Sequence, residues 1–239
     1  MWLGPQRLYL ITGPSNVQEI LRASGHLGNE DLTLRALVQL DGMSQKDIQV
    51  WKNDRSGRGH KATNDTPEKD RIWGPNHKII VDHLSSTAAS ATLMEKFSEL
   101  MMDVINKRSK EKWETVNLWQ FVTTEVVEAA IISIAGRKLL ELNPDFTDAM
   151  WAFDDTIFAL IMGVPKFLYP SGYAKRDRFH EMGDKWHEYA SANYDFNGPD
   201  VDWEEMWGTR FMRVQYQFLK GRGFDKRSIV GMSLGTVWA

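Results

Sequence analysis

The stretch that most constrains the fold is Lys226–Ala239, a run of apolar and small residues with no turn signal inside it. Asp225 can cap its N-terminus, so the run is predicted to be a helix. Gly231 and Gly235 are four residues apart and share one face of that helix. Each glycine costs a helix roughly 1 kcal/mol relative to alanine, a cost that is tolerated where another body approaches the backbone. We expect that body to be a second helix or a flat ligand. Because no stop signal closes the helix, we expect the chain to be part of a larger protein.

Composition narrows the class of protein. The 239 residues are 42% hydrophobic and 11% aromatic, which excludes disorder and permits a substantial core. The net charge is -3 and no basic stripe is visible, so no nucleic-acid partner is expected. The chain has no cysteine, which excludes disulfides, zinc–thiolate sites and cysteine nucleophiles within it. We find no window of about 18 apolar residues and therefore predict no transmembrane segment.

Most of the chain has the periodicity of amphipathic helices. Arg7–Thr12 is expected to be a short strand, with Ser15 capping the helix that follows. Later helices are predicted at 32–40, 76–84, 92–107, 118–135, 144–164, 173–194 and 202–220. The result is a mainly α fold, treated as a single domain over residues 1–239, with about nine helices and about one or two short strands.

Two segments stand apart from this pattern. Lys52–Arg71 has almost no apolar residues and is predicted to be a long surface loop, which either covers a site or is a solvated insertion. Leu118–Ala135 is apolar nearly all round and is expected to be largely buried. Glu125 and Glu128 are the main exceptions on it, and we expect both at a solvent-facing rim.

Several groups of polar residues have the spacing of possible binding sites. His180, Asp184, His187 and Glu188 share a helix face, a spacing that can offer metal ligands, but a solvated polar face is the preferred interpretation and no metal is predicted. His77 follows Pro75 at a predicted helix start, where a histidine or lysine can bind an anionic group; an ordinary surface or cap role is the alternative.

Near the end of the chain, Trp238 lies beside Gly235 and Thr236, and the three can form the wall of a pocket. The alternative is that Trp238 is a core residue. No Ser-His-Asp arrangement is indicated, because no nucleophile elbow or equivalent motif is present.

The sequence resembles the N-terminal half of a cytochrome P450 over essentially its whole length. Leu8–Gln18 is similar to the early strand and helix of that family. Trp51–Gly57, Arg71-Ile72 and His77-Lys78 are similar to the segment that leads into the haem-facing C helix. Gly231–Ala239 is similar to the first part of the I helix. The branch it resembles contains fungal enzymes akin to prostacyclin synthase and sterol 7α-hydroxylases.

This resemblance implies a haem b cofactor held by a cysteine thiolate, and electrons from NADPH–cytochrome P450 reductase. It implies insertion of one oxygen atom of O2 into a C–H bond of an apolar small molecule, at the cytosolic face of the endoplasmic reticulum. The axial cysteine is absent from this chain, so we expect the chain alone to be inactive. The alternative is a non-enzymatic α-helical interaction domain that is complete in itself.

The resemblance also suggests residue roles. His77 and Lys78 are predicted to contact the haem propionates, with Trp73 as the nearest match to the family's Trp-x-x-x-Arg motif. Gly74-Pro75 argues against Trp73 and His77 pairing on one helix. Gly235 is predicted to face the cofactor, and Trp238 and Thr236 to face the substrate.

Overall fold

The computed structural model describes residues 2–3, 6–7, 9, 11–23, 30–59, 61–108 and 115–238. The chain divides into two units, Met1–Leu34 and Arg35–Ala239. In the small unit, strands β1 (Trp2–Leu3) and β2 (Gln6–Arg7) form an antiparallel pair. Tyr9, Ile11 and Thr12 lie outside any strand, so the predicted strand is wrong at these positions, whereas Leu8 and Leu10 are outside the described residues.

The helix that follows is α1 (Pro14–Arg22), which confirms a helix after the Gly13-Pro14 step. The predicted Ser15 cap is wrong, because Gly13 is the N-cap residue, Ser15 lies inside the helix and no side chain caps it. Gly13 has φ +88° and Pro14 occupies the first turn. Glycine adopts that backbone angle without strain, and proline is pre-set for a first helical turn. A local signal of this kind needs no tertiary support.

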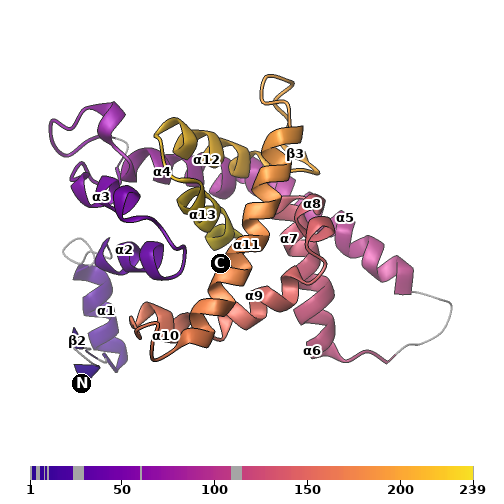
Figure 1. Cartoon of the computed structure of the whole chain (residues 1–239), viewed down its shortest axis with the longest axis horizontal. Helices are drawn as coiled ribbons and strands as arrows, with labels where there is room; N and C mark the ends of the chain where they lie inside the picture. The colour runs from indigo at the N-terminus through magenta and orange to yellow at the C-terminus, as the bar shows by residue number, and fades with distance from the viewer. Residues whose placement is uncertain are drawn as a thin grey trace. The chain divides into compact units, whose positions relative to one another are not determined.

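The larger unit is mostly helical, which confirms a mainly α fold (Figure 1). Its helices in the described residues are α2 (Glu30–Gln39, which begins before the unit boundary), α3 (Gln45–Asn53), α4 (Trp73–Ile80), α5 (Thr87–Arg108), α6 (Leu118–Phe121), α7 (Val127–Ala135), α8 (Arg137–Leu142), α9 (Phe146–Asp154), α10 (Ile157–Ile161), α11 (Pro170–Asn193), α12 (Arg210–Gly221) and α13 (Lys226–Trp238). π-Helical turns η3 (Val81–Ser85) and η4 (Val122–Val126) continue α4 and α6, and η2 (Glu68–Asp70) is a 3-10 turn.

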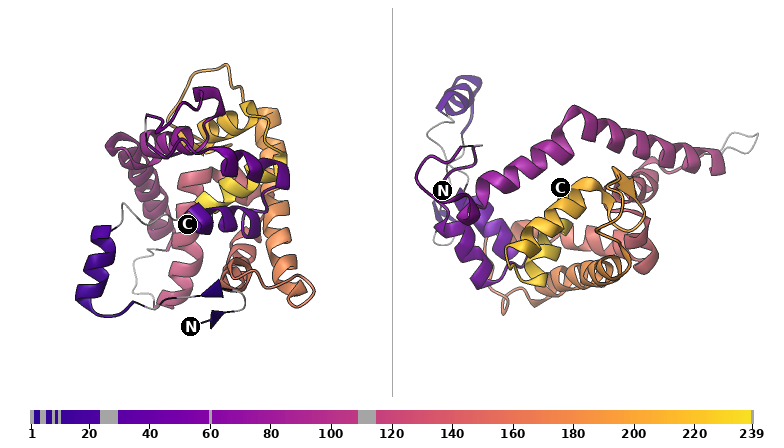
Figure 2. Two further views of the ribbon diagram at one scale, coloured as in Figure 1. Left: turned by 90° about the vertical axis from the view of Figure 1, so that its left-hand side faces the viewer. Right: turned by 90° about the horizontal axis from the view of Figure 1, so that it is seen from above.

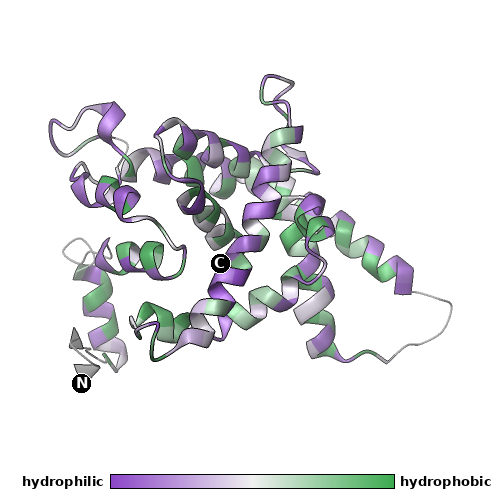
Figure 3. Cartoon of the chain, viewed as in Figure 1, coloured by the Kyte–Doolittle hydropathy of each residue, from purple (hydrophilic) through white to green (hydrophobic). Residues whose placement is uncertain are grey.

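Helix α13 lies at the centre of this unit, between α11 and α12, as Figures 1 and 2 show. Hydrophobic residues run along α7, α10 and α13 (Figure 3). Gly183 brings α11 close to α13, because a Cβ there would lie 2.7 Å from the side chains of Val230 and Leu234. The core around this contact includes the fully buried Phe179, Trp186, Trp207 and Phe211.

One predicted helix, 202–220, is wrong over residues 202–209. Residues 203–209 form a hairpin of β3 (Trp203–Glu204) and β4 (Gly208–Thr209), and α12 begins only at Arg210. The Glu204 carboxylate accepts hydrogen bonds from the backbone N–H groups of Met206 (2.7 Å) and Trp207 (2.6 Å), which closes the turn. Gly208 has φ +70°, a conformation that favours glycine and ends any helix there.

Two further predictions need correction. Residues 144–164 form two helices, α9 and α10, interrupted near Thr156, whose hydroxyl donates to the carbonyl of Phe153 (2.6 Å). Residues 118–135 form one continuous helical segment with a mean hydropathy of 1.4, which is long and apolar enough by composition to cross a membrane. The prediction that no such segment exists is therefore wrong.

The same segment was expected to be largely buried, but only 22% of its residues are buried. Its α7 part is packed into the core through Ile131 and Ala135, whereas Leu118 and Trp119 in α6 are 71% and 75% exposed. Glu128 is exposed and Glu125 pairs with Arg108, which agrees with the expected rim positions.

Candidate functional site

A cavity of about 530 Å³ lies against α13 in the larger unit. This volume is within the range that binds small molecules in proteins. The wall is mainly apolar and comes from elements far apart in the sequence: Ala36, Leu40, Asp41, Asn76, Ile80, Leu84, Ile134, Phe153, Phe179, His180, Phe211, Gln215, Gly231, Met232, Leu234, Gly235, Thr236 and Trp238.

The C-terminal helix supplies one side of the cavity. The three residues predicted from the sequence to form a pocket wall, Gly235, Thr236 and Trp238, all line it. The indole N–H of Trp238 donates to the Asp154 carboxylate (2.8 Å), and its ring lies 6.4 Å from that of Phe153. This bond fixes the indole at the cavity rim. The roles of the three residues toward a cofactor or substrate remain predictions.

The two glycines of α13 face a turn of the chain. A Cβ at position 231 would lie 1.9 Å from the carbonyl oxygen of Asp41, and a Cβ at position 235 would lie 3.1 Å from its carboxylate. The body that approaches this helix is therefore the turn after α2. Close approach as the reason for the glycines is thus right, and the neighbour is a turn and not a second helix. A flat ligand on the cavity side of Gly235 stays a prediction.

Asp41 is an unusual group in this wall. Its side chain is half-buried and lines the cavity, and burial raises its pKa to about 8. A carboxyl group with that pKa is mostly protonated at neutral pH, so it can both donate and accept a hydrogen bond.

His180 lies on the same wall and is neutral for the same reason. Burial, with a smaller contribution from Arg227, lowers its pKa to about 3. Its Nε2 lies 2.9 Å from the carbonyl oxygen of Leu40, which can only accept, so Nε2 carries the hydrogen. The residue therefore holds the end of α2 against α11.

The haem contacts predicted from the resemblance lie elsewhere. Trp73 is buried, donates from Nε1 to the carbonyl of Trp51 (2.9 Å) and packs edge-on against that indole. His77 is exposed, and Lys78 pairs with Asp82. None of Trp73, His77 and Lys78 lines the cavity with Gly235. Helix α4 begins at Trp73, so Trp73 and His77 do share a helix, contrary to the expectation from Gly74-Pro75.

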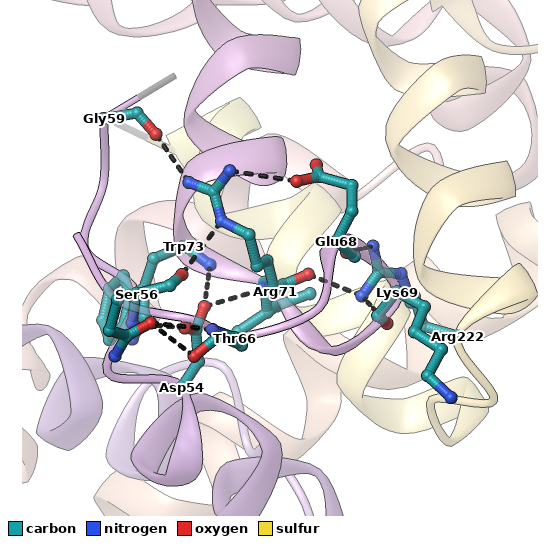
Figure 4. Close-up of polar contacts among 11 residues, drawn as sticks. Asp54, Ser56, Gly59, Thr66, Glu68, Lys69, Arg71, Trp73 and Arg222 are labelled. Carbon is teal, nitrogen blue, oxygen red and sulfur yellow. Dashed lines mark hydrogen bonds and ion pairs between the residues drawn. The ribbon is translucent and has the colours of Figure 1, made fainter. Parts of the chain in front are cut away.

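The polar segment between α3 and α4 is mostly exposed, but buried hydrogen bonds tie its two ends together (Figure 4). Asp54 accepts hydrogen bonds from the backbone N–H groups of Ile72 (2.7 Å) and Trp73 (3.0 Å) and so caps α4. Burial alone would raise the pKa of Asp54, but these bonds, with those from Ser56, outweigh it and lower that pKa. The start of α4 is thus held by a charged cap.

A second group of contacts closes the same segment (Figure 4). The buried Arg71 guanidinium donates to Ser56 Oγ (3.0 Å), the Gly59 carbonyl (2.7 Å) and Glu68 (3.0 Å). Arg222, just after α12, donates to the carbonyl oxygen of Arg71 (2.5 Å). The segment is thereby attached to the end of α12, close to the start of α13.

The sequence predicted that the histidines of α11 lie on a solvated face. This prediction is wrong. His180 and His187 are 1% and 3% exposed. Burial, followed by the charge of Lys226, lowers the pKa of His187 to about 3. Asp184 and Glu188 form ion pairs with Arg227 and Lys226 at the surface. Over the part of the chain that the structure describes, no three His, Cys, Asp or Glu side chains are grouped to hold a metal ion.

Sequence reasoning missed Asp41, Asn76 and Gln215 as cavity residues. For Asp41 the sequence offers one signal: the Asp41-Gly42 step directly after the helix 32–40 indicates a turn at this position. Asn76 and Gln215 sit on helix faces whose neighbours are set only by tertiary packing, so no local signal marks them.

Three fungal proteins that match this chain carry the name of the same family. The chain is 30% identical over 219 residues to the cytochrome P450 monooxygenase calL of Penicillium decumbens, covering 88% of this chain and 40% of that protein. It is 34% identical over 134 residues to the cytochrome P450 monooxygenase fsoE of Humicola fuscoatra, which covers 54% of this chain and 23% of that protein.

A third relative, the cytochrome P450 monooxygenase efuG of Hormonema carpetanum, is 30% identical over 133 residues, or 54% of this chain and 24% of that protein. The chain thus spans less than half the length of the curated relatives it matches. No protein-family model matches it, and no solved structure is significantly similar.

Proposed function

Because the chain belongs to the cytochrome P450 family, we propose that it is the N-terminal portion, one incomplete domain, of a haem-dependent monooxygenase. The complete enzyme inserts one oxygen atom of O2 into a C–H bond of an apolar small molecule, a sterol, lipid or secondary metabolite. The observation that carries this proposal is the apolar cavity of about 530 Å³ beside α13. In this proposal the cavity is the substrate-facing part of the active site, and Gly235, Thr236 and Trp238 form its wall.

The residues of this chain do not by themselves fit a thiolate-bound haem. The sequence contains no cysteine to ligate the iron. The described residues that line the cavity include no lysine or arginine that would pair with the propionates. We therefore propose that the iron ligand and the propionate contacts come from polypeptide beyond this sequence, and that the chain alone is inactive. Contacts from His77 and Lys78 to a propionate stay a prediction, since neither residue lines the cavity.

Two further parts of the proposal come from the family. Electrons are supplied by NADPH–cytochrome P450 reductase, and the complete enzyme is located at the cytosolic face of the endoplasmic reticulum. The apolar segment 118–135 is compatible with a membrane setting by composition, but its α7 half is part of the core. Fractionation of cells that express the tagged full-length enzyme tests the location.

Complementation tests the main proposal. The chain is co-expressed with the part of the Penicillium decumbens relative that lies beyond the aligned region, and haem content and the absorption of the reduced, CO-bound complex are measured. We expect a thiolate-type haem spectrum only when both polypeptides are present. A matched control replaces by serine the cysteine of the added piece that ligates the haem iron, which should abolish that spectrum. If the chain and the unaltered added piece are both folded and still give no thiolate spectrum, the proposal is contradicted.

The alternative, a helical interaction domain that functions alone, is disfavoured by exposed apolar side chains. Phe158 and Phe167 are 71% and 81% exposed, and Leu118 and Trp119 are exposed to a similar extent. In this proposal the rest of the complete enzyme covers these side chains. Thermal melting with a hydrophobic dye separates the two. Strong dye binding at low temperature is expected here, whereas cooperative melting of a monodisperse chain without early dye signal would support the alternative.

A further inference from the structure

Three polar side chains line the apolar cavity and have no hydrogen-bond partner among the described residues. They come from three separate elements: Asp41 from the turn after α2, Asn76 from α4 and Gln215 from α12. Asn76 and Gln215 are 8% and 2% exposed, and the side-chain oxygen of each is buried and unpaired. Buried polar groups in native proteins are nearly always hydrogen-bonded, so several orphans around one cavity call for a partner.

The donor groups of the other polar side chains in the wall are already engaged. Thr236 donates its hydroxyl to the carbonyl of Met232 (3.3 Å), and His180 donates to that of Leu40. The Nδ1 of His180 is also buried without a partner, so the free hydrogen-bonding capacity of the described lining lies with the two amides, the one carboxyl group and this ring nitrogen, which can only accept. An amide can donate or accept, depending on how it is turned, and a protonated carboxyl group can do both.

We propose that the cavity selects an apolar small molecule that carries a hydroxyl group, and that Asp41, Asn76 and Gln215 recognise this hydroxyl. The inference rests on the proposed function in that it concerns the same cavity. A hydroxyl both donates and accepts, which matches the three free groups, and the rest of the ligand contacts the aromatic and aliphatic wall.

A neutral hydroxyl fits better than an ammonium group. Burial of Asp41 favours its protonated form at neutral pH, so it offers no fixed negative charge to a cation. His180, which lines the same cavity, is also neutral. A plain hydrocarbon would leave all three polar groups unpaired, which lowers its affinity relative to the alcohol.

The test uses the complete 239-residue chain and three rigid probes of one shape: 1-adamantanol, 1-methyladamantane and 1-adamantylamine. Dissociation constants are measured by ligand-observed NMR. We expect the alcohol to bind roughly tenfold more tightly than the methyl compound, as one or two satisfied hydrogen bonds give. The amine should bind no better than the methyl compound.

Variants assign the effect to residues. Asn76→Leu, Gln215→Met and Asp41→Leu keep the side-chain size but remove the polar atoms, and each should lower the alcohol-to-methyl preference by about threefold or more. Asp41→Asn keeps hydrogen-bonding capacity and should retain the preference. Met232→Leu, an apolar replacement in the same wall, is the matched control and should leave the ratio unchanged. Circular dichroism checks that each variant is folded.

The outcomes separate this inference from the proposed function. Equal affinity for alcohol and methyl compound would overturn the hydroxyl proposal, with ordered water then satisfying the three groups, while the small-molecule cavity would stand. Tightest binding of the amine would also overturn it, in favour of an ionised Asp41. Failure of all three probes to bind would contradict the cavity itself and with it the structural support for the monooxygenase proposal.

Discussion

Asp41 and Gly231 are in such close contact that any side chain at position 231 would collide with the Asp41 backbone. A Cβ there would lie 1.9 Å from the carbonyl oxygen and 2.7 Å from the carbonyl carbon. The contact joins the turn after α2 to the middle of α13, at the edge of the cavity. Two segments about 190 residues apart in the chain are thereby brought together at the site.

Gly231→Ala is expected to destabilise the fold, since either the turn or α13 must move. Overpacking of this kind costs about 1–3 kcal/mol, which exceeds the helix-propensity gain of roughly 1 kcal/mol from alanine. The free energy of unfolding in urea measures the difference. Gly221→Ala is the matched control, because a Cβ at that position meets nothing within 4 Å. A variant at 231 as stable as the one at 221 would show that this contact is wrong.

Asp54→Ala is expected to lower the free energy of unfolding by about 1–2 kcal/mol, because the cap of α4 is lost. The effect should depend on pH. The folded-state pKa of Asp54 is lowered, so its ionised form stabilises the fold above the unfolded value of about 3.9, and this contribution is lost as pH falls through the folded pKa.

Urea unfolding of wild type and variant at a series of pH values measures the gap. It should be constant near neutrality and shrink below about pH 4. Asp65→Ala, an exposed position in the same segment, should show little effect at any pH. A gap that does not change with pH would mean that the cap acts through its shape and not its charge.

Asp41 should have the opposite pH dependence. Its pKa is raised to about 8 in the folded chain, against about 3.9 when unfolded. Between those values the folded state binds more protons, so stability falls as pH rises from about 4 to about 8 and is level above that. Asp41→Asn removes this titration.

The variant should therefore gain stability relative to wild type as pH rises through that window. Chemical denaturation at pH 5 and pH 8 compares the two. A constant difference would indicate that Asp41 is ionised in the fold, which would also weaken its role as a hydroxyl-binding acid.

The buried histidines of α11 should remain neutral in the folded chain. Burial lowers the pKa values of His180 and His187 to about 3, whereas an unfolded histidine titrates near 6.5. Stability should thus fall as pH drops below about 6.5, because the unfolded chain takes up the protons first.

Imidazole C–H signals of these two residues, followed by NMR, should not shift between pH 8 and pH 5. Replacing His187 by Phe should remove part of the acid sensitivity, since its ring is already packed among Trp186, Trp207 and Tyr216. Titration of either ring near pH 6 in the folded protein would contradict the burial described here.

Local patterns were enough to predict the long helices. Helix α11 (Pro170–Asn193) and helix α13 follow the apolar spacing of the sequence, and α1 follows its Gly-Pro step. The hairpin at residues 203–209 was not predicted, because its turn depends on the Glu204 carboxylate and on Gly208 packing against the backbone of Ile134 and Ala135. The Gly208 contact arises only once α7 is in place, whereas the Glu204 bonds are local to the turn.

The candidate site was predictable only on one side. Gly235, Thr236 and Trp238 lie on a single helix next to one another, so local reasoning grouped them. Asn76 and Gln215 come from α4 and α12, and their faces become a wall only when those helices meet. The predicted solvent face of α11 was wrong for a related reason, since helices pack against it on more than one side and bury His180 and His187.

The two glycine contacts with Asp41 impose different evolutionary constraints. Position 231 faces a main-chain carbonyl, which every amino acid possesses, so no second mutation at position 41 can make room for a larger residue there. Position 235 faces the carboxyl group instead, and that group changes with the residue. Among orthologues, glycine at 231 should therefore be retained whatever occupies 41, whereas the identities at 235 and 41 are free to covary.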